Sequence, residues 1–109
     1  MNAITPLTYA ILLALADAPR HGYGIIKELE SRAGIGSAPS TGALYLALQR
    51  MEADGLIAES NERPESDDRR RRYWAMTPAG REVAEAESHR LAALVATARE
   101  KDLLAGGSA

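Results

Sequence analysis

Four arginines follow one another directly in this 109-residue chain: Arg69, Arg70, Arg71 and Arg72. A guanidinium group binds phosphate oxygens through paired N–H donors, so such a run is typical of a segment that contacts a phosphate backbone. Three nearby acids, Glu65, Asp67 and Asp68, support a second interpretation, a solvated loop with balanced charge. Alternate side chains of an extended segment point to opposite faces, so we expect about two of the four arginines to reach a phosphate backbone at once.

A second group of polar residues lies between positions 40 and 50. The Tyr45 hydroxyl is able to donate to a phosphate, and the side chains of Gln49 and Arg50 suit the edges of adenine and guanine respectively. The alternative is structural, with the Tyr45 ring packed on the preceding helix and with Gln49 and Arg50 on an ordinary exposed face. A helix that starts here also presents open backbone N–H groups to an anion at three residues: Ser40, Thr41 and Gly42.

The preceding segment adds three residues to these candidates. His21 and Tyr23 stand at the start of a predicted helix, where one of them is placed to contact a nucleic-acid backbone, and Lys27 adds a positive charge one turn later. His21 is equally well explained as a turn residue. His89 follows Glu85 by one helical turn, but no second pair of this kind occurs, so we expect an exposed contact and no metal site.

No catalytic constellation accompanies these residues. The sequence holds no cysteine, no nucleophile elbow, no phosphate-binding glycine loop and no zinc-ligand spacing. We therefore predict neither an enzyme nor a protein with a cofactor. No apolar run approaches about 18 residues and no secretory signal is present, so we expect a cytoplasmic protein.

The elements that must position these side chains are mostly helical. Thr5 and the proline after it are a typical cap and first turn, and the apolar run that follows predicts a helix over 6–17. A turn over 18–24 leads to a second predicted helix over 25–33, ended by Gly34. A third helix begins at residue 40 or 41 and ends before Gly55, which we expect in a left-handed conformation. Its apolar residues form one narrow stripe: Leu44, Leu48 and Met51.

Two strands are predicted over 56–60 and 71–77, joined by a charged loop into a hairpin. In the second strand, alternation places Trp74 and Met76 on one face and Tyr73 with Ala75 on the other, as in a half-buried strand. Helices followed by such a hairpin are typical of the winged helix-turn-helix, whose third helix enters the major groove of DNA.

A last helix, capped by Thr77, is predicted to reach about Leu104. It would be about 37 Å long, more than a body of this size covers, so its apolar stripe needs a partner. A two-fold homodimer is the commonest solution, with the apolar first helix against the partner's last helix. The alternative is a last helix folded back on its own domain. The predicted dimer contacts are Leu7, Ile11, Val83, Leu91, Leu94, Val95 and Ala98.

The charge balance argues against strong nucleic-acid binding. The net charge is -2, and the region from Ala18 to Met76 holds nine bases and nine acids. A positive surface therefore requires an uneven distribution of charges over the protein, with Lys27, Arg50 and the hairpin arginines on one side and the acids elsewhere. We expect modest non-specific affinity and a moderate dependence on salt.

Three segments, HGYGIIKELESRAG, STGALYLALQRMEADGLIAE and DDRRRRYWAMTPAGRE, occur in this order and together resemble the PadR family of bacterial transcriptional regulators. The resemblance covers residues 7–85. It implies a winged-helix homodimer that usually represses genes at a palindromic operator, with an effector that relieves repression in many members. It also implies a phosphate contact by Tyr45 and a single long dimerisation helix, as in the smaller members.

Two positions depart from the family pattern. Leu46 stands where the family typically has proline after Leu-Tyr, and Gly24 stands where glutamate is frequent. Some small members bind flat hydrophobic compounds between subunits through aromatic residues of the last helix. This helix has no aromatic residue, which argues against such a pore here.

We thus predict a mostly α (α+β) protein, with a winged helix-turn-helix DNA-binding domain over 1–76 and a dimerisation helix over 77–109. The predicted function is sequence-specific repression of transcription by a homodimer on double-stranded operator DNA, released by a small-molecule effector. The alternative is a winged-helix module that binds another protein and does not read DNA, which the neutral charge balance favours.

Overall fold

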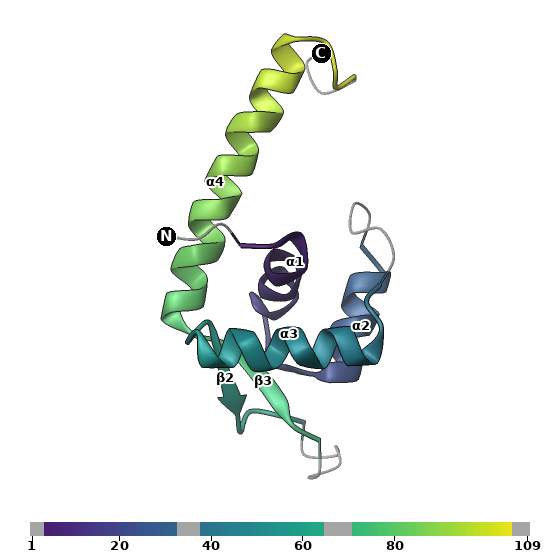
Figure 1. The fold of residues 1–109 in the computed structure, drawn as a ribbon, viewed down its shortest axis with the longest axis vertical. Helices are drawn as coiled ribbons and strands as arrows, with labels where there is room; N and C mark the ends of the chain where they lie inside the picture. The colour runs from purple at the N-terminus through teal and green to yellow at the C-terminus, as the bar shows by residue number, and fades with distance from the viewer. Residues whose placement is uncertain (1–3, 33–37, 65–70, 106–109) are drawn as a thin grey trace.

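The computed structural model describes residues 4–32, 38–64 and 71–105. Its elements are α1 (Pro6–Leu15), β1 (Arg20–His21), α2 (Gly22–Glu30), α3 (Thr41–Ala53), β2 (Ile57–Ser60), β3 (Tyr73–Met76) and α4 (Pro78–Glu100). The fold is mostly helical with one small antiparallel sheet, as the sequence predicts. Figure 1 shows α1, α2, α3 and the sheet gathered into one body, from which α4 extends.

Helix starts agree with the predicted caps. The side chain of Thr5 accepts a hydrogen bond from Thr8 N at 3.0 Å, and that of Ser40 accepts from Ala43 N at 3.1 Å. Thr77 accepts in the same way from the backbone N–H three residues later, at 3.0 Å. Each bond satisfies an N–H group that the first helical turn leaves without a partner, which fixes where the helix begins.

The second helix differs from its prediction at its start. It begins at Gly22 rather than residue 25, because the His21 ring supplies the cap by accepting from Gly24 N through Nδ1 at 3.0 Å. It ends at Glu30, and the predicted end near Gly34 lies outside the described residues. The last helix also ends earlier than predicted, at Glu100 instead of Leu104.

The sheet has three strands in the order β1-β3-β2, one more than the predicted hairpin. The extra strand, β1, pairs Arg20 with Trp74 and His21 with Tyr73. Tyr73 and Trp74 are both buried, so the prediction of a half-buried strand is wrong at this end. On the Tyr73 side, the His21 ring lies at right angles with its centroid 5.2 Å away, and the Arg63 guanidinium lies 5.0 Å from the centroid of the Tyr73 ring.

The core lies between the three short helices and the sheet. The predicted stripe of α3 is confirmed, since Leu44, Leu48 and Met51 are at most 2% exposed. The chain leaves α3 at Gly55, whose φ of 78° is the expected left-handed conformation. Leu56 N then donates to Met51 O at 2.9 Å, closing the helix end. Only one side of α3 is therefore used by the core.

The first half of α4 docks on the body through a close backbone approach. Gly80 lies so near the chain before β2 that a Cβ atom there would collide with the carbonyl oxygen of Leu56. Further along, Ser88 Oγ lies 2.7 Å from the Tyr9 hydroxyl of α1. Gly80 and Ala84 are the buried residues of α4 among those described, and its C-terminal half projects beyond the body (Figure 1).

Candidate nucleic-acid interface

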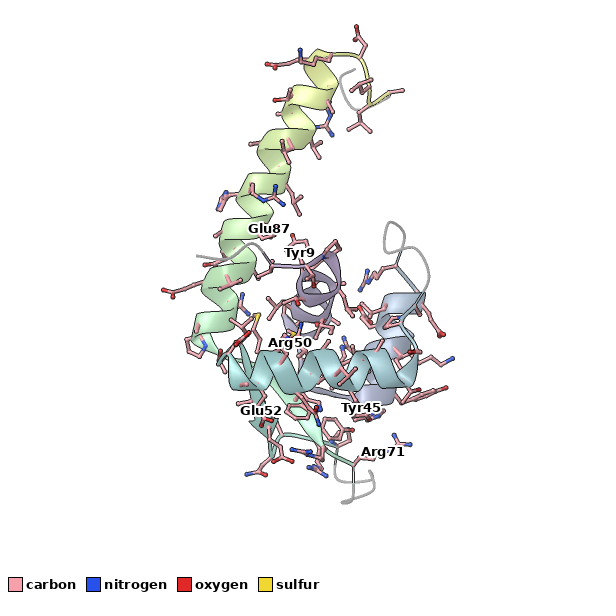
Figure 2. All side chains as sticks on the ribbon, in the orientation of Figure 1. Tyr9, Tyr45, Arg50, Glu52, Arg71 and Glu87 are labelled. Atoms are coloured by element: carbon pink, nitrogen blue, oxygen red, sulfur yellow. The ribbon has the colours of Figure 1, made fainter. Side chains whose placement is uncertain are left out.

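The exposed face of α3 is the centre of the candidate interface. A helix turns by about 100° per residue, so the line opposite the buried stripe is made of Gly42, Leu46, Gln49 and Ala53. All four are exposed, and Leu46 is 69% exposed. In Figure 2, Tyr45 and Glu52 lie along the edge of α3 that faces the hairpin, and Arg50 lies along the other edge.

The start of α3 is open to solvent. Ser40, Thr41 and Gly42 are exposed, and a Cβ atom added at Gly42 would meet nothing within 4 Å. The N–H groups of this first turn and the positive end of the helix dipole together suit an anion. The structure thus brings the three predicted residues together at one accessible helix end.

Tyr45 combines parts of both interpretations that the sequence leaves open. Its side chain packs against the start of α2, where a Cβ atom on Gly22 would collide with the Tyr45 hydroxyl. The residue is nevertheless 45% exposed, so part of its side chain is accessible to solvent.

Tyr23 and Lys27 form an exposed stack on α2. The Tyr23 ring lies nearly parallel to the His21 ring at 6.3 Å, and Lys27 Nζ is 5.4 Å from the centroid of the Tyr23 ring. Contact with Tyr23 raises the pKa of Lys27, and Glu30 at 3.7 Å adds to the effect. Lys27 therefore adds a positive charge to this side of α2, with Glu30 close beside it.

His21 also contacts the hairpin. Its Nε2 lies 2.8 Å from Arg71 Nη1. Arginine can only donate, so Nε2 is the acceptor of this contact, whereas the cap uses Nδ1 as the acceptor of Gly24 N. A neutral imidazole carries one N–H, so each tautomer makes one of the two bonds. The contact between His21 and the hairpin was not predicted from the sequence.

Arg72 points to a different partner from Arg71, as alternation along the chain predicts. Arg72 Nε donates to Glu59 Oε1 of β2 at 2.8 Å, and the guanidinium lies 4.8 Å from the Trp74 ring centroid. The bond to Glu59 raises the pKa of Arg72. Arg72 is thus paired across the sheet with Glu59, while Arg69 and Arg70 lie outside the described residues.

Positive and negative side chains are only partly separated around α3. Arg50 makes no ion pair within the described part of the chain, so its charge is available at the interface. Glu52 and Glu59 lie on the hairpin side, and both act on Arg72. The interface therefore combines a few exposed bases with acids at one margin, in agreement with the neutral charge count.

A second surface, distant from the α3 face, is formed by α1, α2 and α4. It is a groove of about 960 Å³ whose lining includes Leu7, Tyr9, Leu13, Glu87, Arg90 and Leu91. Leu13 is half exposed and was not among the predicted dimer contacts. Its position off the main apolar face of the first helix is the feature of the sequence from which this contact could have been predicted. Beyond the groove, Leu94 and Val95 are 55% and 39% exposed.

The remaining predicted dimer contacts lie elsewhere. Ile11 is fully buried in the core of its own chain and has no surface for a partner. Leu7 and Val83 pack partly against that core, and Ala98 is half-buried on the projecting part of α4. The predicted set is thus divided between the core, the groove and the free end of α4.

Within the three described ranges, no group of three or more His, Cys, Asp or Glu residues is placed to hold a metal ion. None of the helices in those ranges is both long enough and apolar enough to cross a membrane.

Comparison with known proteins identifies the family. The model of the transcriptional regulator PadR-like family matches residues 11–86, and the chain belongs to this family. The PadR-like family consists of transcriptional regulators, in agreement with the prediction that the chain is not an enzyme.

Two curated relatives support this assignment. Transcriptional regulator Rv3488 of Mycobacterium tuberculosis is 45% identical over 71 residues, which are 65% of this chain and 62% of that protein. An uncharacterized 37.1 kDa protein in transposon Tn4556 of Streptomyces fradiae is 44% identical over 84 residues, 77% of this chain. The chain spans 22% of the length of the Streptomyces protein and 62% of the mycobacterial one.

Solved structures confirm the winged-helix fold. A PadR family regulator from Clostridium difficile matches with a TM-score of 0.75 and 25% identity, over 88% of this chain and 97% of that chain. Bacillus subtilis PadR in complex with operator DNA matches with a TM-score of 0.63 and 20% identity, over 75% of this chain and 46% of that chain.

Proposed function

We propose that this protein is a homodimeric repressor of transcription that binds a palindromic operator in the bacterial cytoplasm. The exposed face of α3 carries this proposal, because a helix buried along one stripe leaves base-reading side chains on the opposite side. Gln49 would read adenine and Arg50 guanine in the major groove. The operator complex of Bacillus subtilis PadR supports DNA as the ligand.

The phosphate contacts would surround α3. The Arg71 guanidinium, held at 2.8 Å from His21 Nε2, would donate its other N–H groups to a phosphate oxygen, and Lys27 would lie near a neighbouring phosphate. The open first turn of α3 and the Tyr45 hydroxyl would add donors between these positions. Arg69 and Arg70 stay predicted phosphate contacts. Arg72 has the smaller role, since it is already paired with Glu59.

Dimerisation would bury the free half of α4. The exposed apolar residues of that half, Leu94 and Val95, suit the groove of a second copy, whose walls include Leu13 and Leu91. DNA binding thus belongs mainly to residues 1–76 and dimerisation to 77–109, with α1 serving both. An effector that changed the angle between the two α4 helices would move both α3 helices out of register with the operator.

The test is fluorescence anisotropy with DNA from directly upstream of the protein's own gene and with scrambled DNA, at several salt concentrations. We expect selective binding at about 0.15 M salt, with a logarithmic slope of about -0.9 for each phosphate contact. Arg50→Ala should lower the affinity by about 1–3 kcal/mol for each half-site. Arg99→Ala, the same change of charge on α4, is the control.

Equal affinity for the two DNAs by a folded, dimeric protein would contradict the proposal. That result would favour a winged-helix module that binds another protein.

A further inference from the structure

Leu46 is the largest apolar side chain on the exposed line of α3. It lies directly opposite the buried stripe and is 69% exposed. The two ends of the line are Gly42, one turn before it, and Ala53, two turns after it, and neither carries a side chain larger than a methyl group. Leu46 therefore projects further from the helix than the residues at either end of this line.

The core of the chain does not explain this leucine. It is absent from the core and from the partly buried residues packed against it, which do include Ala47 next to it. Gly42 has no packing reason either, since a Cβ atom there would meet nothing within 4 Å, whereas glycine in a helix costs up to about 1 kcal/mol relative to alanine. This face thus has a glycine at position 42, where the helix has room for a larger residue. At position 46 it has an apolar residue, where a polar side chain would interact better with solvent.

The major groove offers one apolar feature along its base edges, the C5-methyl group of thymine. The other features are hydrogen-bond donors and acceptors, to which a leucine side chain contributes nothing. The absence of a side chain at Gly42 lets the start of α3 approach the bases closely, which is the condition for contact between a leucine and a methyl group.

We propose that Leu46 is a specificity-determining residue that reads thymine through its C5-methyl group. This proposal rests on the proposed function. Gln49 lies one turn further along the same face and suits adenine. Three residues of helix span about 4.5 Å, similar to the 3.4 Å step between base pairs, so the thymine read by Leu46 lies one or two base pairs from that adenine.

The test removes only the methyl group. Each thymine of the operator half-site is replaced in turn by deoxyuridine, symmetrically in both half-sites, which leaves every hydrogen-bonding group in place. At one position we expect the wild-type affinity to fall about fourfold for each lost methyl contact, hence about fifteenfold for the two half-sites together. Other thymines should show little effect.

Variants of Leu46 assign that effect to this side chain. Leu46→Ala should bind the thymine and deoxyuridine operators equally, and Leu46→Met, which keeps an apolar contact, should retain most of the discrimination. Leu103→Ala, at another exposed leucine (78%), is the matched control and should discriminate as the wild type does. All variants should unfold at the wild-type temperature, because an exposed leucine contributes little to packing and alanine favours helix.

Three results would overturn the proposal. A half-site without thymine, or operators that bind equally with and without the methyl groups, would show that no methyl group is read. Discrimination retained by Leu46→Ala would assign the contact to another residue. In each of these cases selective operator binding would still support the proposed function, whereas equal binding of operator and scrambled DNA would overturn both.

Discussion

At the scale of single residues, His21 links the start of α2 to the hairpin through its two ring nitrogens. Nδ1 caps α2 by accepting from Gly24 N, and Nε2 lies 2.8 Å from Arg71. One side chain thus serves helix formation and, in the proposed function, the placement of Arg71 beside a phosphate. These two roles are separable because asparagine replaces the first and lacks the Nε2 that contacts Arg71.

We expect His21→Asn to keep the cap and most of the stability, but to weaken operator binding through loss of the Nε2 contact that places Arg71. His21→Ala should weaken binding similarly and also lower the free energy of unfolding by about 1 kcal/mol through loss of the cap. Urea unfolding and anisotropy measure the two effects separately. Operator binding by His21→Asn at the wild-type level would show that His21 is a structural residue only.

Residue roles were predictable where the determinant is local. The caps at Thr5, Ser40 and Thr77 depend on a residue type and on the N–H group three positions later, so the sequence predicts them. The role of His21 was not predictable, because it depends on a β1 strand that exists only by pairing with β3, about fifty residues away. Arg72 shows the same limit, since its partner Glu59 is found across the sheet.

At the scale of elements, α4 carries an ion pair at the wall of the groove. Arg90 donates to both carboxylate oxygens of Glu87, and this bonding lowers the pKa of Glu87 below its ordinary value of 4.5, against the opposing effect of desolvation. A carboxyl group whose pKa is lowered by folding stabilises the folded state above its ordinary pKa. That contribution is lost as the pH falls through the folded-state pKa.

We therefore expect the stability of the wild type to fall more steeply below about pH 4.5 than that of Glu87→Gln, with little difference in slope above about pH 6. Urea unfolding at a fixed protein concentration, from acidic to neutral pH, measures this. Glu85→Gln, on the same helix, controls for the loss of a charge. Identical pH profiles of Glu87→Gln and the wild type would show that the pair adds nothing to stability.

Element prediction succeeded for α3 and for the two strands of the hairpin, but it missed β1 and the burial of Tyr73. The stripe of Leu44, Leu48 and Met51 repeats with the period of a helix, so its buried side is visible in the sequence. The burial of Tyr73 on the second face of β3 is not visible in this way, because the groups that pack on it, the His21 ring and the Arg63 guanidinium, come from other segments. The exposed line with Leu46 follows from the same period as the stripe, although a role for Leu46 was not inferred from the sequence.

At the scale of the whole molecule, α4 is shared between two tasks. Its first half is fixed to the body by the close approach at Gly80 and by the contact between Ser88 and Tyr9. Its second half carries exposed apolar residues away from the body, in a molecule of 50 × 29 × 24 Å. A rigid helix that joins the DNA-binding body to the dimer contact would fix the distance between the two α3 helices of a dimer. This distance must be about 34 Å on a palindrome.

The most direct measurement compares the affinity of the full chain for its palindromic operator and for the same DNA with about five base pairs inserted between the half-sites. The insertion rotates one half-site by about half a turn of DNA, so we expect the wild type to fall to the affinity of a single half-site. Leu94→Glu, which places a charge in the proposed dimer contact, should sediment as a monomer and bind both DNAs equally weakly. Equal, tight binding of both DNAs by the wild type would contradict a rigid homodimer that reads a palindrome.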